Sequence, residues 1–221
     1  MRFAEAYGFL RGLEPPDAIR AYSILGGTPA YLAYAYGARS LREVVERVLF
    51  PGSPLLDEAE GLLRQELREP RRYMALLRAV AEGRASLYEA AVAAGIDTRT
   101  VHRYFEILEE LDIVELRRPL GFRRGTRVFF RDDYYRFWFT YVLPNRHALE
   151  LGRGFSRVAD HVLRTIDSYS AQTFRRIVED HLQELHMLGA VPTEPLRYGP
   201  WWLRGEEIDA VVINPGNRHR F

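Results

Sequence analysis

The sequence predicts a mainly helical protein with a small β component, built around a winged helix-turn-helix. Apolar residues recur at helical spacing through most of residues 1–112. Two short strand-like segments then flank a loop that contains proline and glycine, and one more strand-like run lies near the end. With 221 residues, 47% of them hydrophobic, the chain is long enough to bury a core in one or two domains.

Residues 1–69 form the first expected segment, and it is helical. The expected helices are FAEAYGFLRGL, DAIRAYSIL, a short one after the GGTP turn, SLREVVERVLF and, beyond the PGSP break, LLDEAEGLLRQELRE. In the turn, Thr28 can cap the helix that follows, and Pro29 suits its first position. Gly26 and Gly27 permit a positive φ and the close approach of another group. Two interpretations remain open for that group, a nucleotide or simply a neighbouring packed element.

Residues 70–152 form the second segment, which begins with three helices and a hairpin. PRRYMALLRAVAEG closes at Gly83, Ser86 caps LYEAAVAAG, and Asp97 or Thr98 caps RTVHRYFEILEELD. The strands IVELRR and RVFFR follow, joined by the loop PLGFRRGT. This order is typical of a winged helix-turn-helix, in which the third helix reads DNA.

The expected DNA contacts lie at the start of the third helix and on the wing, which is the hairpin with its loop. At the helix start they are Arg99, Thr100, His102 and Arg103. On the wing they are Arg117, Arg118, Arg123, Arg124 and Arg127. Winged helices also dock proteins, and the carboxylates of Glu106, Glu109 and Glu110 would repel DNA if they faced it. DNA contact and protein docking therefore both remain open.

All 31 basic residues are arginine, which is typical of a GC-rich genome and compatible with a hot habitat. A chain without lysine can supply neither the P-loop lysine nor a Schiff-base lysine. The lack of cysteine excludes disulfides and thiolate metal sites. No run resembles a signal peptide or a membrane span, so we expect a cytoplasmic protein with no membrane partner.

Aromatic residues are concentrated in DDYYRFWFTYVLPN, which we interpret as a packed seam between the winged helix and residues 153–221. That third segment is expected to begin with the helix SAQTFRRIVEDHLQELHMLG, followed by loops, GPWW, and a strand, EEIDAVVI. The turn signal NPGN predicts that a hairpin begins after this strand.

Several runs of the sequence resemble the C-terminal half of the archaeal ATPase family and occur in the same order as in that family. Its members are AAA+-related ATPases of the STAND type. The runs are YSILGGTPAYL, LLRQELREPRRYMALLRAVAEG, YFEILEELDIV, RDDYYRFWFTYVLPNRHALELG and GPWWLRGEEIDAVV. The resemblance implies a helical lid segment over 1–69, a winged helix, and an incomplete α/β domain similar to PD-(D/E)xK nucleases over 153–221. The P-loop core of the family has no counterpart in these residues.

In such ATPases the lid turn lies against the adenine side of a nucleotide held by the core, and Gly27, Thr28 and Pro29 match that turn. The resemblance thus implies no cofactor for this chain alone, and ATP with Mg²⁺ only beside a P-loop core from elsewhere. Nuclease-like folds of this type bind Mg²⁺ through acids on two strands and often one on the first helix. Asp209 matches the first strand position, with Glu207 and Glu179 as further candidates. The second strand position would fall after NPGN.

We therefore expect a non-catalytic regulatory part of an archaeal ATPase-like protein that binds DNA through its winged helix. A nuclease completed by another chain and a docking module for an ATPase partner are the alternatives. The expected partners are DNA, a P-loop ATPase core or a homologous protein, and a second copy of the chain.

Overall fold

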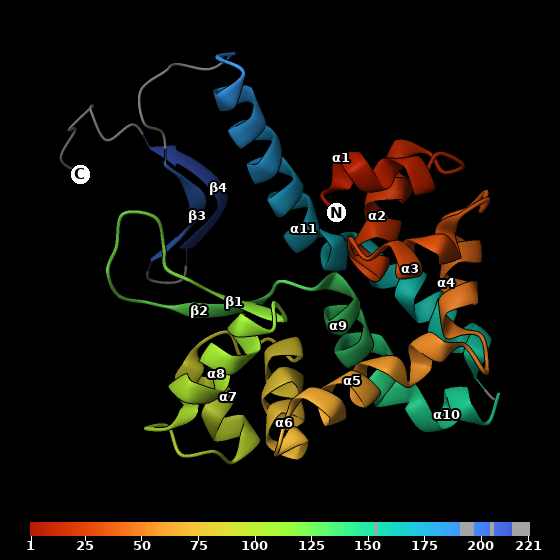
Figure 1. The fold of residues 1–221 in the computed structure, drawn as a ribbon, viewed down its shortest axis with the longest axis horizontal. Helices are drawn as coiled ribbons and strands as arrows, with labels where there is room; N and C mark the ends of the chain where they lie inside the picture. The colour runs from red at the N-terminus through yellow and green to blue at the C-terminus, as the bar shows by residue number, and fades with distance from the viewer. Residues whose placement is uncertain (153, 191–196, 204–205, 214–221) are drawn as a thin grey trace.

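A computed structural model of the chain describes residues 1–152, 154–190, 197–203 and 206–213 (Figure 1). Within these residues the fold is mainly helical with two small antiparallel sheets of two strands each, which confirms the predicted fold class. One contiguous core of buried apolar side chains extends from the first helix to the first half of the last one. No helix in this part of the chain combines the length and apolar composition of a membrane span.

The N-terminal part consists of short helices, as predicted. They are α1 (Phe3–Ala6), η1 (Tyr7–Phe9), α2 (Pro15–Leu25), α3 (Pro29–Leu32), η2 (Ala33–Ala35) and α4 (Leu41–Leu49). Proline occupies the first position of α2 and α3, where the missing N–H costs nothing. The Ser40 hydroxyl caps α4 by accepting a hydrogen bond from the Glu43 amide at 3.3 Å.

The long helix expected over 55–69 is shorter in the structure. A 3₁₀ turn, η3 (Pro54–Leu56), precedes α5 (Glu58–Glu66). The chain becomes extended at Leu67, ahead of Pro70, whose ring disfavours a helical conformation in the residue before it. The side chain of Leu67 is buried and fixes this turn on the core.

The predicted winged helix is present. It consists of α6 (Pro70–Ala81), α7 (Leu87–Ala94), α8 (Val101–Glu110), β1 (Val114–Arg117) and β2 (Arg127–Phe130). Ser86 and Glu89 form a capping box at the start of α7, and Gly95 ends that helix with φ +68°. The strands pair antiparallel from Val114 opposite Phe130 to Arg117 opposite Arg127.

The predicted cap of the third helix is wrong. Thr100, not Asp97 or Thr98, precedes the first residue of α8, and its side chain makes no capping hydrogen bond. The Asp97 carboxylate instead accepts a hydrogen bond from the Arg99 amide at 2.9 Å. Residues 97–100 form a turn, because the Thr100 amide donates to the Asp97 carbonyl at 3.0 Å.

The aromatic seam packs against both the N-terminal helices and the winged helix. It comprises α9 (Asp133–Phe137), a π-helical turn (Trp138–Val142), η5 (Leu143–Asn145) and α10 (Arg146–Glu150). Tyr134 and Trp138 are buried and donate hydrogen bonds to the carbonyls of Leu55 and Leu56, both at 2.8 Å. The seam therefore fastens residues 133–150 to the end of the N-terminal helices, a contact that the prediction did not include. Toward the following segment, as predicted, Tyr141 packs on Tyr169 with ring centres 5.2 Å apart.

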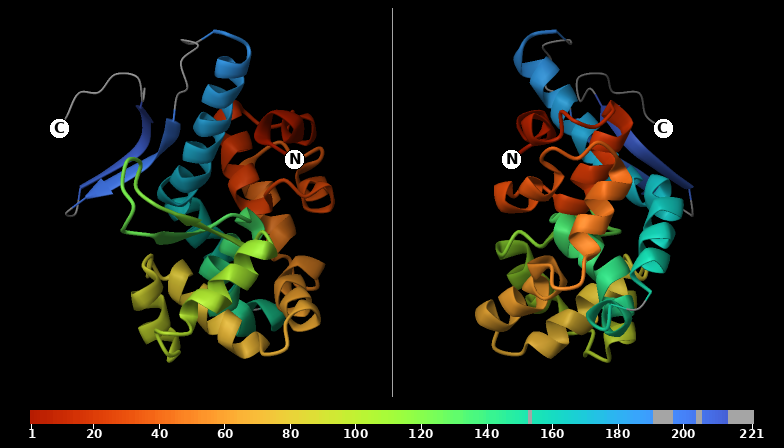
Figure 2. Two further views of the ribbon diagram at one scale, coloured as in Figure 1. Left: turned by 60° about the vertical axis from the view of Figure 1, so that its left-hand side comes forward. Right: turned by 90° about the vertical axis from the view of Figure 1, so that its right-hand side faces the viewer.

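The last part contains α11 (Phe155–Met187), β3 (Arg197–Leu203) and β4 (Glu206–Ile213). In Figures 1 and 2, α11 passes the N-terminal helices and continues beside the β3–β4 hairpin. Two predictions are corrected here. The helix begins at Phe155, well before Ser170, and GPWW lies in strand β3, not in a loop. β4 thus has an antiparallel partner before it, with an irregularity at Gly199–Trp201, while NPGN lies outside the described residues.

Candidate nucleic-acid interface

The start of α8 presents polar side chains to solvent. Arg99, Thr100, His102 and Arg103 are all exposed, whereas Val101 is buried beneath them. Arg99 forms an ion pair with Asp97 at 2.7 Å, although its own side chain is 87% exposed. A pair this exposed is weak and exchangeable, so the guanidinium remains accessible to an anionic ligand.

The three acidic residues of α8 differ in their surroundings. The Glu109 carboxylate accepts a hydrogen bond from the Leu116 amide at 2.9 Å and thus holds β1 against the helix. Glu106 and Glu110 are exposed. Only two of the three carboxylates therefore lie where they could repel DNA.

The structure divides the five wing arginines into two groups. Arg118, Arg123 and Arg124 are exposed on and beside the loop between the strands. Arg117 and Arg127 are only 20% and 30% exposed and form ion pairs within the chain. Arg117 contacts Glu179 of α11 at 2.8 Å, and Arg127 contacts Glu207 of β4 at 2.9 Å.

The C-terminal hairpin packs directly on the wing. Trp202 is buried, and its indole N–H donates to the Gly125 carbonyl at 3.0 Å. The Arg127 guanidinium lies over the Trp202 ring at 4.7 Å, and the Leu120 amide donates to the Pro200 carbonyl at 2.9 Å. These contacts fix the base of the wing loop and leave its tip exposed.

The structure describes the side chains of two of the three candidate nuclease acids, Glu179 and Glu207. Glu179 and Glu207 lie on different elements, each in an ion pair with a wing arginine. Arg175 is a second partner of Glu207, at 3.6 Å. Asp209 is part of β4, but its side chain lies outside the described residues. The described part of the chain contains no group of three or more histidine or acidic side chains arranged to hold a metal ion.

The GGTP turn has a neighbour in this structure. Gly26 ends α2 with φ +67°, a conformation that favours glycine. The Gly27 carbonyl accepts a hydrogen bond from the amino group of Met1 at 2.9 Å, and a Cβ on Gly27 would lie 2.1 Å from the Met1 carbonyl oxygen. Thr28 precedes α3 without capping it through its side chain, and Pro29 is exposed at the first helical position.

Gly26, Gly27 and Thr28 border a polar hollow of about 760 Å³. Its wall carries more acidic than basic side chains. The acidic ones are Glu5, Asp112, Glu115, Asp132, Asp133, Glu179 and Asp180. Burial raises the pKa of Asp132 to about 6 and also raises the pKa of Glu115. A nucleotide phosphate would meet net negative charge in this hollow.

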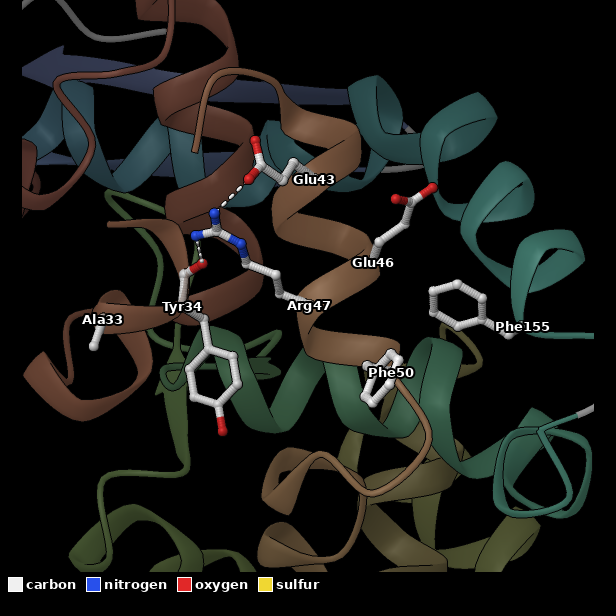
Figure 3. A pocket seen from close by; sticks show the side chains of 7 residues that line it. All are labelled: Ala33, Tyr34, Glu43, Glu46, Arg47, Phe50 and Phe155. Carbon is white, nitrogen blue, oxygen red and sulfur yellow. Dashed lines mark hydrogen bonds and ion pairs between the residues drawn. The ribbon is translucent and has the colours of Figure 1, made fainter. Parts of the chain in front are cut away.

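A second hollow, of about 700 Å³, lies on α4 (Figure 3). Arg47 donates to the Tyr34 carbonyl at 3.0 Å and pairs with Glu43, while Phe50 and Phe155 form the apolar end. Phe50 is 61% exposed.

The sequence interpretation missed Trp202 and Asp133, which organise the region around the wing. Asp133 is buried at the start of α9, where it accepts a hydrogen bond from Thr173 at 2.6 Å and pairs with Arg176. Their hydrogen-bond partners lie 40 and 77 residues away in the chain, so no local pattern marks them. Only the aromatic pair in GPWW signalled that a packed element was present.

Comparison with known proteins gives a family for the last part of the chain. Residues 138–221 match DUF234, described as archaeal and bacterial proteins of unknown function. An uncharacterized protein of Methanocaldococcus jannaschii is 26% identical over 212 residues, which cover 91% of this chain and 46% of that protein. The chain thus spans about half the length of this curated relative. No solved structure matches the chain.

Proposed function

We propose that this chain is the C-terminal regulatory part of an archaeal ATPase-like protein and that it binds duplex DNA through its winged helix. The observation that carries the proposal is the exposed face at the start of α8, where Arg99, His102 and Arg103 project from a helix held in place by the core. The length of the archaeal relative, about twice that of this chain, leaves room for an ATPase core outside the matched region.

In this proposal, the two exposed regions have different roles. The start of α8 enters the major groove, where Arg99 and Arg103 can donate to base edges. Arg118, Arg123 and Arg124 on the wing loop contact the phosphate backbone, which supplies affinity without sequence preference. Arg117 and Arg127 hold the wing to the C-terminal elements and do not need to contact DNA.

Fluorescence anisotropy with labelled duplexes over a series of salt concentrations tests the proposal. Arg123→Gln with Arg124→Gln should weaken binding to all sequences alike. The negative slope of log K against log salt should become less steep by about 2, because two phosphate contacts are lost. Arg103→Ala should cost about 1–3 kcal/mol and relax the preference at one base pair. Arg11→Gln with Arg164→Gln removes the same charge from exposed positions outside the winged helix and should change little.

Protein docking is the second candidate function, and two observations favour it. Glu106 and Glu110 are exposed on α8, and two of the five wing arginines are already paired within the chain. If the wild-type chain shifts no duplex at about 50 mM salt, a condition that strengthens phosphate contacts, docking replaces DNA binding as the proposal.

The nuclease alternative has a separate test. Incubation of plasmid and single-stranded DNA with Mn²⁺ should give no cleavage, because Glu179 and Glu207 are both paired with arginines. Cleavage that disappears in Asp209→Ala would establish an active nuclease, whereas cleavage that survives this change would indicate a contaminant.

A further inference from the structure

A third hollow lies beside the DNA-reading face of α8. Its volume is about 520 Å³, and it is bounded on one side by the junction of α5 and α6 and on the other by the first half of α8. Three arginines line it, namely Arg68 and Arg72 from the junction and Arg103 from α8. Thr100, at the start of α8, also lines it.

We infer that this hollow binds a backbone phosphate of the same DNA whose bases are read by α8. The inference rests on the proposed function and extends it, because it adds Arg68 and Arg72 to the interface. Arg103 belongs to both surfaces, so a phosphate in the hollow would be continuous with a duplex lying along the start of α8. Arginine suits this role, since its planar donors match a phosphate group.

The core fixes the position of the junction relative to α8. Leu67 is buried next to Arg68, and Tyr73 packs edge-on against Tyr104 of α8, with ring centres 5.1 Å apart. Arg72 donates a hydrogen bond to the Tyr104 hydroxyl at 2.6 Å, which holds its guanidinium against α8. The junction and α8 are thus fixed relative to each other, and Arg72 is held on the α8 side of the hollow.

The charges in the hollow favour an anion. Within the described residues, Arg68 and Arg103 have no carboxylate at ion-pair distance. Arg72 lies 3.4 Å from Glu69, but both side chains are 56% exposed, so this pair is weak and can be exchanged for a phosphate. Glu66 and Glu69 also line the hollow, and three arginines outnumber them.

DNA backbone fits the hollow better than a free nucleotide does. Tyr73 is buried against Tyr104 and offers no face on which a base could stack. The flanking α8 face offers donors for base edges in a groove, and only a duplex would occupy both surfaces at once.

The test compares two double variants in the same salt series. Arg68→Gln with Arg72→Gln should make the negative slope of log K against log salt less steep by about 2. It should also weaken binding equally for all sequences. The matched control is Arg64→Gln with Arg78→Gln, which removes two arginines from α5 and α6, the helices on either side of the junction. Each is paired along its helix, with Glu60 or Glu82, and neither lines the hollow. The control should leave the slope unchanged.

Tyr104→Phe provides an independent variant, because it keeps the ring packed on Tyr73 and removes the hydroxyl that holds Arg72. It should weaken binding to a smaller extent, about 2- to 5-fold, with the melting temperature close to that of the wild type. If the wild type binds DNA and Arg68→Gln with Arg72→Gln leaves the salt slope unchanged, this inference is overturned while the proposed function stands. If the wild type binds no DNA, both are overturned. If ATP alone competes at micromolar concentration, the hollow is a nucleotide site and the inference is again wrong.

Discussion

Replacing Trp202 with alanine should release the C-terminal hairpin from the wing. The indole is 6% exposed, donates to the Gly125 carbonyl and packs near Phe129 with ring centres 5.8 Å apart. Truncation of a buried tryptophan costs about 3–5 kcal/mol. The cation–π contact with Arg127 adds about 0.5–1 kcal/mol at a partly exposed site. Because the hairpin lies at the edge of the fold, this energy should appear as local opening of the hairpin, with the helical core still folded.

Hydrogen exchange measures that opening directly. The Leu120 amide donates to the Pro200 carbonyl, so its exchange requires the wing and hairpin to separate. A loss of 3–5 kcal/mol predicts an increase in its exchange rate of roughly 10²-fold or more. Trp201→Ala is the matched control, because neighbouring side chains on a strand point to opposite faces and Trp201 is only half-buried. Equal exchange of Leu120 in the wild type and Trp202→Ala would refute the reasoning.

Three further predictions concern Asp132, Asp133 and the absence of lysine from the sequence. Burial raises the pKa of Asp132 from 3.8 to about 6, so the folded state binds more protons between these values and stability falls as pH rises through that window. Asp132→Asn keeps an acceptor for the Tyr135 amide. It should be more stable than the wild type by about 1–3 kcal/mol at pH 7–8, but not near pH 3.5. Equal urea midpoints for the variant and the wild type at both pH values would contradict this. Asp133→Ala leaves the Arg176 side chain, which is 19% exposed, without its buried carboxylate partner. It should lower the free energy of unfolding in urea by about 2–3 kcal/mol, less than for a fully buried pair, and a loss below about 1 kcal/mol would show that the pair is not needed. Calorimetric titration with Mg·ATP should give no micromolar binding, because the chain has no lysine for a P-loop.

Local signals in the sequence were sufficient for the winged helix. Ser86 and Gly95 mark both ends of α7 through chemistry confined to a few residues. Two strand-like runs on either side of a loop with proline and glycine marked the hairpin. The start of α8 was misplaced because Asp97 has the usual identity of a cap but bonds to Arg99 in a preceding turn. Local patterns therefore identified the element and missed its boundary.

Long-range pairing was not accessible from the sequence. GPWW was expected to be a loop because Pro200 and Gly199 disfavour strands, yet this segment pairs with β4 across an irregularity. The sequence marked Arg117 and Arg127 as basic wing residues, but their carboxylate partners lie 62 and 80 residues further along the chain. Whether an arginine is free for a ligand depends on such distant partners, and so the DNA contacts remain predictions.

The 33 residues of α11 make a rod about 50 Å long, and its attachments lie at different points along it. Asp160 and Asp167 in its first half pair with Arg42 and Arg20 of the N-terminal helices. Glu179, well beyond its midpoint, pairs with Arg117 at the base of the wing. One continuous helix therefore joins the N-terminal helices to the base of the wing. Any displacement of the wing relative to those helices would have to bend α11 or break one of these ion pairs.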